Sequence, residues 1–309
     1  MLEGRNIDFM GKRRISAIVS TVLVLASILL IVFRGLNLGL DFTGGTLVEV
    51  GYEQPADLDS IRNALEAKGF ERASVQYFGT SKEVLIRLAP REGENRSMLS
   101  DEVIHTLQEA SDDKVEMRRV EFVGPQVGEE LREDGGLAML YALFGILIYV
   151  AFRFEYRFSF ASIIALVHDV VLTLGFFAAT QMEFDLTVLA AVLAVIGYSL
   201  NDTIVVFDRI RENFRKVRKG TPEEVINISI NQTISRTIIT SLTTLLVLVA
   251  LFLLGGEIIH SFSVALIVGV VVGTYSSIYI ASNAVLAMGV SQKDLIPEER
   301  DDSELDSMP

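Results

Sequence analysis

Ionisable and amide side chains interrupt apolar runs at three places, and these are the residues of the chain that could do chemistry. Asn201 and Asp202, in the stretch GYSLNDTIVVFDRIREN, lie well inside one apolar run. Arg236 lies near the start of a second run, and His168 and Asp169 lie about halfway along a third. An acidic side chain at the centre of a membrane helix costs about 2.5–3.5 kcal/mol on insertion scales. A chain keeps such a group where it faces a partner or water, so these positions predict a functional site.

Depth indicates which of these groups can meet. Asp202 lies six residues before Asp208, where the charged end of its run begins, and this places it about 9 Å deeper along a helix. Arg236 enters from the same membrane face, and its long side chain can reach that level. Thr240 and Thr244 follow Arg236 at i+4 and i+8 and form a hydroxyl row. A carboxylate that is neutral when unpaired and ionised when paired is a proton-binding site with two states.

Simpler roles compete with a proton site. Asp202 could only join helices by hydrogen bonding, and Arg236 could only anchor its helix at the interface. His168 and Asp169 could serve helix packing instead of a relay. If a relay exists beside Asp202 and Arg236, its candidate members are Asn201, His168, Asp169, Thr240 and Thr244.

Enzyme chemistry is not predicted. The chain has no cysteine, no Ser/His/Asp arrangement and no GxxxxGK[ST] phosphate loop. His105 lies on an expected amphipathic helix without nearby metal-ligand residues, so we expect no metal site and no cofactor. A nucleic-acid partner is also excluded, because no basic stripe with interleaved aromatic residues is present.

The elements that must position these residues are membrane helices. Half of the 309 residues are hydrophobic, and they gather in runs near the roughly 20 residues that span a bilayer. The runs cover residues 15–33, 136–152, 158–180, 186–207, 234–254 and 262–288. The first follows a basic cluster but is longer than a signal-peptide core of about 7–15 residues, so we expect an uncleaved first helix.

Charge predicts the orientation of these six helices. Basic residues precede the first helix, follow the second at Arg153 and Arg157, and gather from Arg209 through Lys219. The positive-inside rule makes all three places cytoplasmic, together with both termini. The net charge of −13 comes mostly from residues 38–134, which carry 21 acidic and 11 basic residues, and from the acidic tail 290–309.

Residues 38–134 have the pattern of a small external α+β domain. Alternating segments and helical segments follow one another in the order βαββαβ, which is typical of a ferredoxin-like fold. We therefore expect a first helix within residues 1–37, this domain at 38–134, a five-helix bundle at 135–289 and a cytoplasmic tail at 290–309.

Glycine-rich connectors bracket the external domain. We interpret GLDFTGGT and FVGPQVG as turns that join a rigid membrane base to a mobile domain. Their candidate residues are Gly39, Asp41, Gly44, Gly45, Gly124, Pro125 and Gly128.

Small residues recur every fourth position in the last apolar run. Ala265, Gly269, Gly273, Ser277 and Ala281 share one helix face, which predicts close packing through Gly269 and Gly273. The sequence leaves open whether the opposing helix belongs to this chain or to a partner.

Several motifs, in order and at matching spacing, resemble the SecF branch of the SecD/SecF family. They are GLDFTGGT, EFVGPQVG, FRFEYRFSFASIIALVHD, IGYSLNDTIVVFDRIREN and SRTIITSLTT. The family belongs to the resistance-nodulation-division transporters, and the resemblance implies one half of such a transporter. It also implies that Asp202 and Arg236 conduct protons.

The resemblance further implies the partners and the place of work. It indicates a bacterial inner-membrane subunit that pairs with SecD and works beside the SecY-SecE-SecG channel with YajC. The pair would use the proton motive force to promote export of preproteins. Two alternatives remain: half of a proton-driven small-molecule or lipid exporter, and a passive scaffold for SecD.

Overall fold

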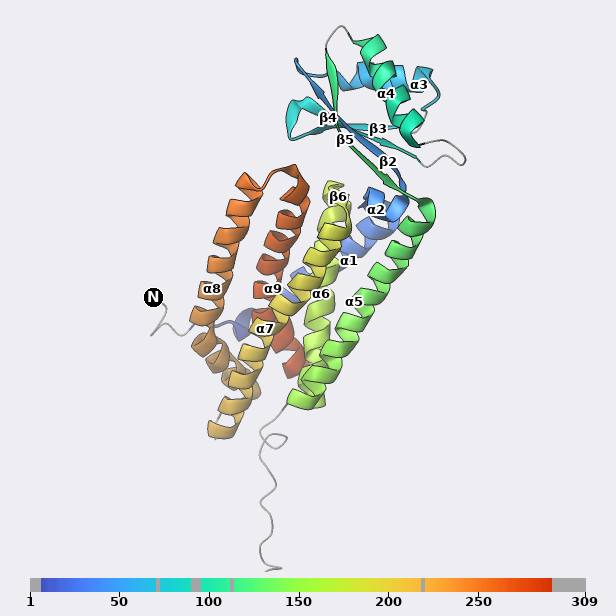
Figure 1. The fold of residues 1–309 in the computed structure, drawn as a ribbon. Helices are drawn as coiled ribbons and strands as arrows, with labels where there is room; N and C mark the ends of the chain where they lie inside the picture. The colour runs from blue at the N-terminus through green and yellow to red at the C-terminus, as the bar shows by residue number, and fades with distance from the viewer. Residues whose placement is uncertain (1–6, 71–72, 90–95, 112–113, 218–219, 291–309) are drawn as a thin grey trace, which may run out of the picture.

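The chain forms a bundle of long helices with a small sheet-containing domain above one end (Figure 1). This computed structural model describes residues 7–70, 73–89, 96–111, 114–217 and 220–290. Part of the acidic tail predicted at 290–309 lies outside these residues. The predicted fold class, a polytopic helical membrane protein with an external α+β domain, is confirmed.

Six helices among the described residues are long and apolar enough to cross a membrane. A short 3-10 helix, Met10–Lys12, precedes the first of them, and another, Glu257–Ile259, precedes the last. The six are α1 (Arg13–Phe33), α5 (Pro125–Arg153), α6 (Tyr156–Thr180), α7 (Leu186–Lys216), α8 (Pro222–Leu254) and α9 (His260–Ala287).

Three of these helices are much longer than their apolar runs. Both α5 and α8 begin with a proline at the first helical position, Pro125 and Pro222, where the missing N–H costs nothing. A capping box formed by Thr221 and Glu224 also starts α8. Helix α7 continues past Phe207 through polar residues to its end. The apolar runs thus mark the membrane-spanning parts of longer helices.

The external domain contains a four-stranded antiparallel sheet in the order β3-β4-β2-β5. Figure 1 shows α3 and α4 together on one face of it. Apolar residues that alternate along the strands, such as Val48, Val50, Val84 and Ile86, form the core beneath these helices. The elements are β2 (Gly45–Tyr52), α3 (Leu58–Ala67), β3 (Ser74–Phe78), β4 (Thr80–Leu88), α4 (Arg96–Ala110) and β5 (Val115–Val123).

A small junction joins this domain to the bundle. Strand β1 (Asn37–Leu38) pairs in parallel with β6 (Glu183–Phe184), the segment between α6 and α7. One turn of helix, α2 (Leu40–Thr43), follows β1 and packs against α5. The chain therefore enters the external domain directly above the outer end of α7.

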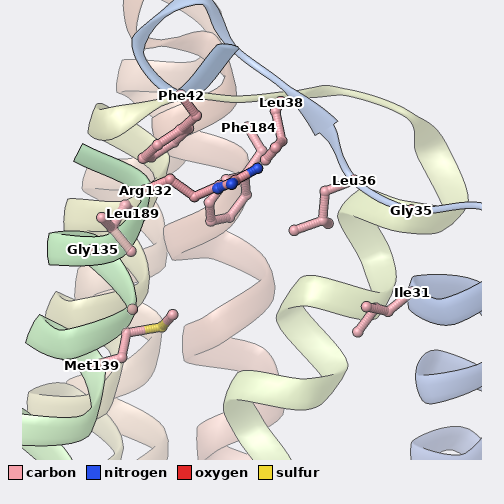
Figure 2. A pocket seen from close by; sticks show the side chains of 11 residues that line it. Ile31, Gly35, Leu36, Leu38, Phe42, Arg132, Gly135, Met139, Phe184 and Leu189 are labelled. Carbon is pink, nitrogen blue, oxygen red and sulfur yellow. The ribbon is translucent and has the colours of Figure 1, made fainter. Parts of the chain in front are cut away.

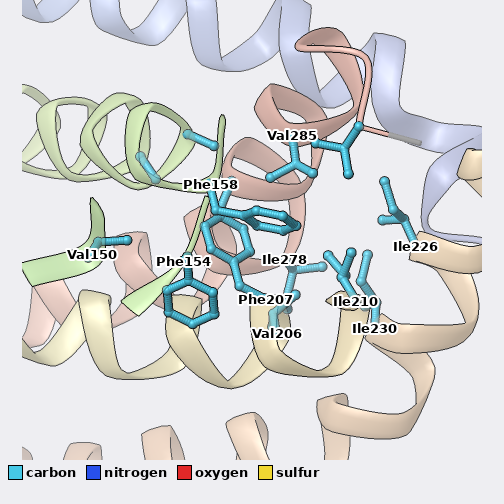
Figure 3. Packing of buried hydrophobic residues seen from close by; sticks show 14 of the residues in the cluster. Val150, Phe154, Phe158, Val206, Phe207, Ile210, Ile226, Ile230, Ile278 and Val285 are labelled. Carbon is cyan, nitrogen blue, oxygen red and sulfur yellow. The ribbon is translucent and has the colours of Figure 1, made fainter. Parts of the chain in front are cut away.

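Within the bundle, α9 packs against α6, α7 and α8, while α1 and α5 each pack against α6. Opposite the external domain, the helices meet in a hydrophobic cluster (Figure 3). The rings of Phe158 on α6 and Phe207 on α7 lie 5.1 Å apart, and Ile226 and Ile230 of α8 belong to the same cluster. This packing holds together the halves of α7 and α8 that lie away from the external domain.

Candidate functional site

Helices α7 and α8 form a hairpin that brings Asp202 and Arg236 to the same depth. Asp202 lies fourteen residues before the end of α7, and Arg236 lies fourteen residues after the start of α8. Because only five residues separate the two helices, which pack against each other, equal distances from these facing helix ends mean equal levels. Each residue is about 21 Å of helix away from that end.

The Asp202 carboxylate is buried at this level with an incomplete set of partners. Only 3% of the residue is exposed, and its Oδ2 has no hydrogen-bond partner among the described residues. The positive charge of Arg236 acts on it, and the hydroxyls of Thr240 and Ser241 lie beside it. Arg236 is exposed and forms no ion pair with any residue that the structure describes. The two charges face each other without a direct bond.

The hydroxyls of α8 donate their hydrogens elsewhere. Thr240 Oγ1 donates to the Arg236 carbonyl at 3.1 Å, and Thr244 Oγ1 donates to the Thr240 carbonyl at 3.0 Å. Ser241 Oγ is 2.7 Å from Thr274 Oγ1 on α9. Their oxygens retain lone pairs, so the row predicted from spacing can accept a hydrogen bond from a protonated carboxyl group or from water.

Two further polar atoms near Asp202 are buried and unpartnered in the described chain, Thr203 Oγ1 and Thr237 Oγ1. Asn201, the neighbour of Asp202, is exposed on the surface of the chain. Since most buried polar groups are hydrogen-bonded, several orphan atoms next to one carboxylate mark this place as a site for water, protons or a partner side chain.

The second intramembrane carboxylate has a different environment. Asp169 Oδ1 lies 2.9 Å from His168 Nδ1, and its Oδ2 accepts from Ser199 Oγ on α7 at 2.5 Å. Both oxygens of Asp169 are thus engaged, and the contact joins α6 to α7. Among the described residues, no hydrogen bond or ion pair connects this pair to Asp202 or Arg236. The bonds of Asp169 fit a role in helix packing, whereas Asp202 retains an oxygen without a partner.

The first glycine-rich motif supports α7. Asp41 Oδ2 accepts a hydrogen bond from the backbone N–H of Leu186, the first residue of α7, at 3.0 Å. A carboxylate at a helix N-terminus is favourable because it meets free N–H groups and the positive end of the dipole. The Gly39 N–H donates to the carbonyl of Phe184 at 2.8 Å. The motif therefore binds the outer end of the helix that carries Asp202.

At two positions of this motif, only glycine fits, because a residue with a side chain would be strained or would clash. Gly44 and Gly45 have φ angles of +66° and +125°, which other residues rarely adopt. A Cβ on Gly45 would lie 2.3 Å from the carbonyl oxygen of Leu88. These residues form a close-packed turn into β2.

The second glycine-rich motif joins β5, which ends at Val123, to α5, which begins at Pro125. Gly124 caps α5, Pro125 begins it, and Gly128 lies in its first turns with ordinary helical geometry. A Cβ on Gly128 would lie 2.8 Å from the backbone nitrogen of Gly44. The expected close backbone approach is present, and the motif connects the external domain to the bundle as the first part of a helix. The mobility that we predicted for both motifs stays a prediction.

The small-residue face of α9 lies against α7 of the same chain. A Cβ on Gly269 would lie 2.1 Å from Val195 Cγ2, and one on Gly273 would lie 3.0 Å from Ser199 Cβ. These positions allow the two helices to approach closely. The contacted residues of α7, Val195 and Ser199, lie one to two turns before Asp202.

Comparisons with known proteins agree with these motifs. A family model for the C-terminal part of the protein export membrane proteins SecD/SecF matches residues 103–291, and a model for the SecD/SecF GG motif matches residues 29–56. The chain is 52% identical to the protein translocase subunit SecF of Vibrio alginolyticus, over 99% of this chain and 98% of the relative. It is 50% identical to that of Pseudomonas aeruginosa over 96% of each.

The chain belongs to the SecF family. Crystal structures of SecDF are similar as well. This SecF family chain matches the translocon-associated SecDF of Thermus thermophilus with a TM-score of 0.84 and 40% identity over 93% of its length. It matches SecDF in a super-membrane-facing form with a TM-score of 0.69 and 41% identity. In both cases it spans 39% of the solved chain.

One ion pair of this SecF family chain was not predicted from its sequence. Arg87 on β4 lies 2.5 Å from Glu183 on β6 and donates to the carbonyl of Leu38 at 3.2 Å. Burial raises the pKa of the Glu183 carboxyl, and the Arg87 guanidinium opposes that rise. Arg87 interrupts the apolar second half of β4, which is a weak signal, but nothing in the sequence indicates its partner 96 residues away.

Proposed function

We propose that this SecF family chain is one half of a proton-driven protein-export unit of the bacterial inner membrane, which SecD completes. The unit would promote passage of preproteins through the SecY-SecE-SecG channel, with YajC as an accessory. The observation that carries the proposal is the buried Asp202 carboxylate. Its Oδ2 lacks a hydrogen-bond partner among the described residues, and it interacts electrostatically with Arg236. The names of the relatives, translocase subunits, support the transport role.

The protonation of Asp202 would change its attraction to α8. When it is ionised, the carboxylate attracts the Arg236 guanidinium. When it is protonated, this attraction is lost and the carboxyl group can donate to the hydroxyl oxygen of Thr240 or Ser241. A proton that enters from outside and leaves inside would therefore alternate two arrangements of α7 and α8.

The junction provides a route from this change to the external domain. The outer end of α7 lies sixteen residues from Asp202, about 24 Å along a stiff helix. There Asp41 binds the first N–H of α7, and β1 pairs with β6. A shift of α7 would be transmitted through these bonds to the base of the external domain, which holds or releases the preprotein.

The second half of the unit would cover the outer face of α8. Arg236 and many apolar side chains of α8 are exposed on the isolated chain, and so is Asn201 on the neighbouring helix α7. The apolar side chains include Ile238, Ile239, Leu242, Leu246 and Val247. A guanidinium at this depth is costly against lipid, so a partner that supplies polar groups is favoured, and SecD fits this role. The basic residues at the far end of the bundle support cytoplasmic termini.

Replacement of one carboxylate tests the proposal. We expect Asp202→Asn to insert and assemble normally and to abolish the stimulation of preprotein export by a proton gradient. Export into vesicles, with and without the gradient, measures this effect. Asp208→Asn is the matched control, because Asp208 lies on the same helix in a half-exposed pair with Arg153 that is worth about 0–1 kcal/mol. Full stimulation with Asp202→Asn would contradict the proton role and favour a scaffold.

A further inference from the structure

A pocket of about 470 Å³ lies at the outer end of the bundle, beneath the junction (Figure 2). Its walls come from the ends of α1 and α5, from β1 and α2, and from β6 and the start of α7. Since α1 and α5 both pack against α6, the pocket lies in the space between them. In Figure 1, α2 and α5, which line the pocket, lie on the side of the bundle opposite α8.

The lining is apolar with one exception. It consists of side chains such as Ile31, Leu36, Phe42, Met139 and Phe184, and of glycines that leave space. A Cβ on Gly136 would meet no atom within 4 Å. The volume falls in the range of about 300–1,000 Å³ that is common for ligand pockets.

Arg132 is the only ionised residue of the lining. Figure 2 shows its guanidinium extending from α5 across the pocket toward Phe184 and Leu38. Arg132 is exposed and forms no hydrogen bond or ion pair with another residue in the described ranges. A cation that lies over an apolar pocket without a carboxylate partner suits a ligand that is anionic at one end and apolar at the other.

We propose that this pocket binds a glycerophospholipid of the outer leaflet, with one acyl chain between α1 and α5 and the phosphate on Arg132. The depth fits, because the lining begins in the last turn of α1 and ends at the short strands above the bundle. The flanks also face lipid, since Val32, Phe33 and Leu140 are exposed on the same two helices. A guanidinium group donates two parallel hydrogen bonds to a phosphate. A lipid without a phosphate has no anionic group to accept them.

The surrounding charges favour a phosphate that belongs to a lipid over a free ion. Glu129, Glu133 and Asp134 neighbour Arg132 on α5, and their negative charge repels a free anion. A phospholipid overcomes this repulsion because burial of its acyl chain contributes about 0.8 kcal/mol for each CH₂ group. The apolar lining and the single cation thus act on the same ligand.

Native mass spectrometry of the full chain in detergent tests the site. The probes are phosphatidylglycerol and a diacylglycerol with the same acyl chains. We expect one phosphatidylglycerol per chain and little diacylglycerol. Arg132→Gln should reduce phosphatidylglycerol binding about tenfold or more, the loss of one charge-assisted contact, and Gly136→Leu should abolish it by filling the pocket.

A matched control excludes a general effect of a larger residue on α5. Gly145 lies on the same helix, away from the pocket, and a Cβ there would also meet no atom within 4 Å. We expect Gly145→Leu to bind phosphatidylglycerol like the wild type. Equal binding by Gly136→Leu, or no retained phospholipid in the wild type, would overturn the site. Equal binding of diacylglycerol, or no effect of Arg132→Gln, would overturn the pairing of phosphate with Arg132.

Discussion

Two carboxylates lie inside the bundle, and their hydrogen bonds separate their roles. Asp169 uses both oxygens, toward His168 and Ser199, and so joins α6 to α7. Asp202 retains an unpartnered oxygen beside Arg236 among the residues described. A group whose bonds are complete in one arrangement stabilises that arrangement, whereas an incomplete set allows a second one. Of the two, Asp202 is therefore the candidate for a two-state proton site.

The identity of the opposing cation can be tested at position 236. We expect Arg236→Lys to impair proton-driven export at normal protein levels, because a compact ammonium lacks the planar fork of Arg and can lose its proton. Export into vesicles under a proton gradient measures the effect. Arg14→Lys, at the exposed start of α1, is the control and should leave export unchanged. Full activity of Arg236→Lys would reduce Arg236 to a membrane anchor that snorkels.

At the scale of elements, α9 determines where α7 can lie. The helices approach so closely at Gly269 that a Cβ would overlap Val195. In a membrane, such contact supplies dispersion energy that the hydrophobic effect does not provide between helices. One turn further along, Gly273 contacts Ser199, the residue that binds Asp169. The small face of α9 thus aligns α7 with both α6 and α8.

A larger side chain on this face should damage the fold of the chain itself. We expect Gly269→Leu to destabilise the bundle by about 1–3 kcal/mol or more, as overpacking of a core does. The thermal midpoint and protease resistance of the purified protein measure this loss. Val271→Leu adds bulk on the exposed side of the same helix, where Val271 is 53% exposed, and should be neutral. Unchanged stability of Gly269→Leu together with loss of SecD in pull-down would show that the face serves a partner.

At the scale of the whole molecule, the ion pair between Arg87 and Glu183 holds the external domain to the bundle. The two side chains are only 17% and 26% exposed, so removal of one partner would leave the other charge partly buried and uncompensated, which costs more than the loss of a surface pair. Burial raises the pKa of Glu183 above its ordinary value of 4.5, the carboxylates of Asp185 and Asp41 add to the rise, and Arg87 opposes it. A raised folded-state pKa means that this group's contribution to stability falls as pH increases above 4.5.

Removal of the cation should make the junction pH-sensitive. We expect Arg87→Gln to raise the pKa of Glu183 further and to destabilise the junction by about 1–3 kcal/mol at neutral pH. Acidification toward pH 4.5 should restore it. Distances between two spin labels, one on the external domain and one on the bundle, measure the opening, and the chain has no cysteine of its own to interfere.

The double variant Arg87→Gln with Glu183→Gln provides the control for this effect. Because it removes both charges, it should close the junction again at neutral pH and abolish the pH dependence. If the single and double variants behave alike, the pair does not hold the domain, and the β1–β6 pairing alone carries the attachment.

Much of the architecture could be predicted from the sequence. The six apolar runs, the alternating strands of the external domain and the small face of the last helix are periodic patterns, and periodicity is set by the residues of one segment. The depth of Asp202 below Asp208 and the reach of the Arg236 side chain also indicated that the two could meet, whereas their equal distance from the facing helix ends came from the structure. Helix ends were less predictable. Helices α5 and α8 begin at Pro125 and Pro222, well outside the apolar runs, because proline has a backbone geometry that suits the first helical position.

Only the tertiary structure decided which segments meet. Asp41 binds the N-terminus of α7 at a separation of 145 residues, and Gly269 of α9 lies on α7 rather than on a partner helix. Likewise, the sequence contains Arg132 and Gly136, but the pocket exists only because β1, β6 and α5 close around it. Such contacts depend on how whole elements pack, and the sequence pattern of one segment does not indicate which segment packs against it.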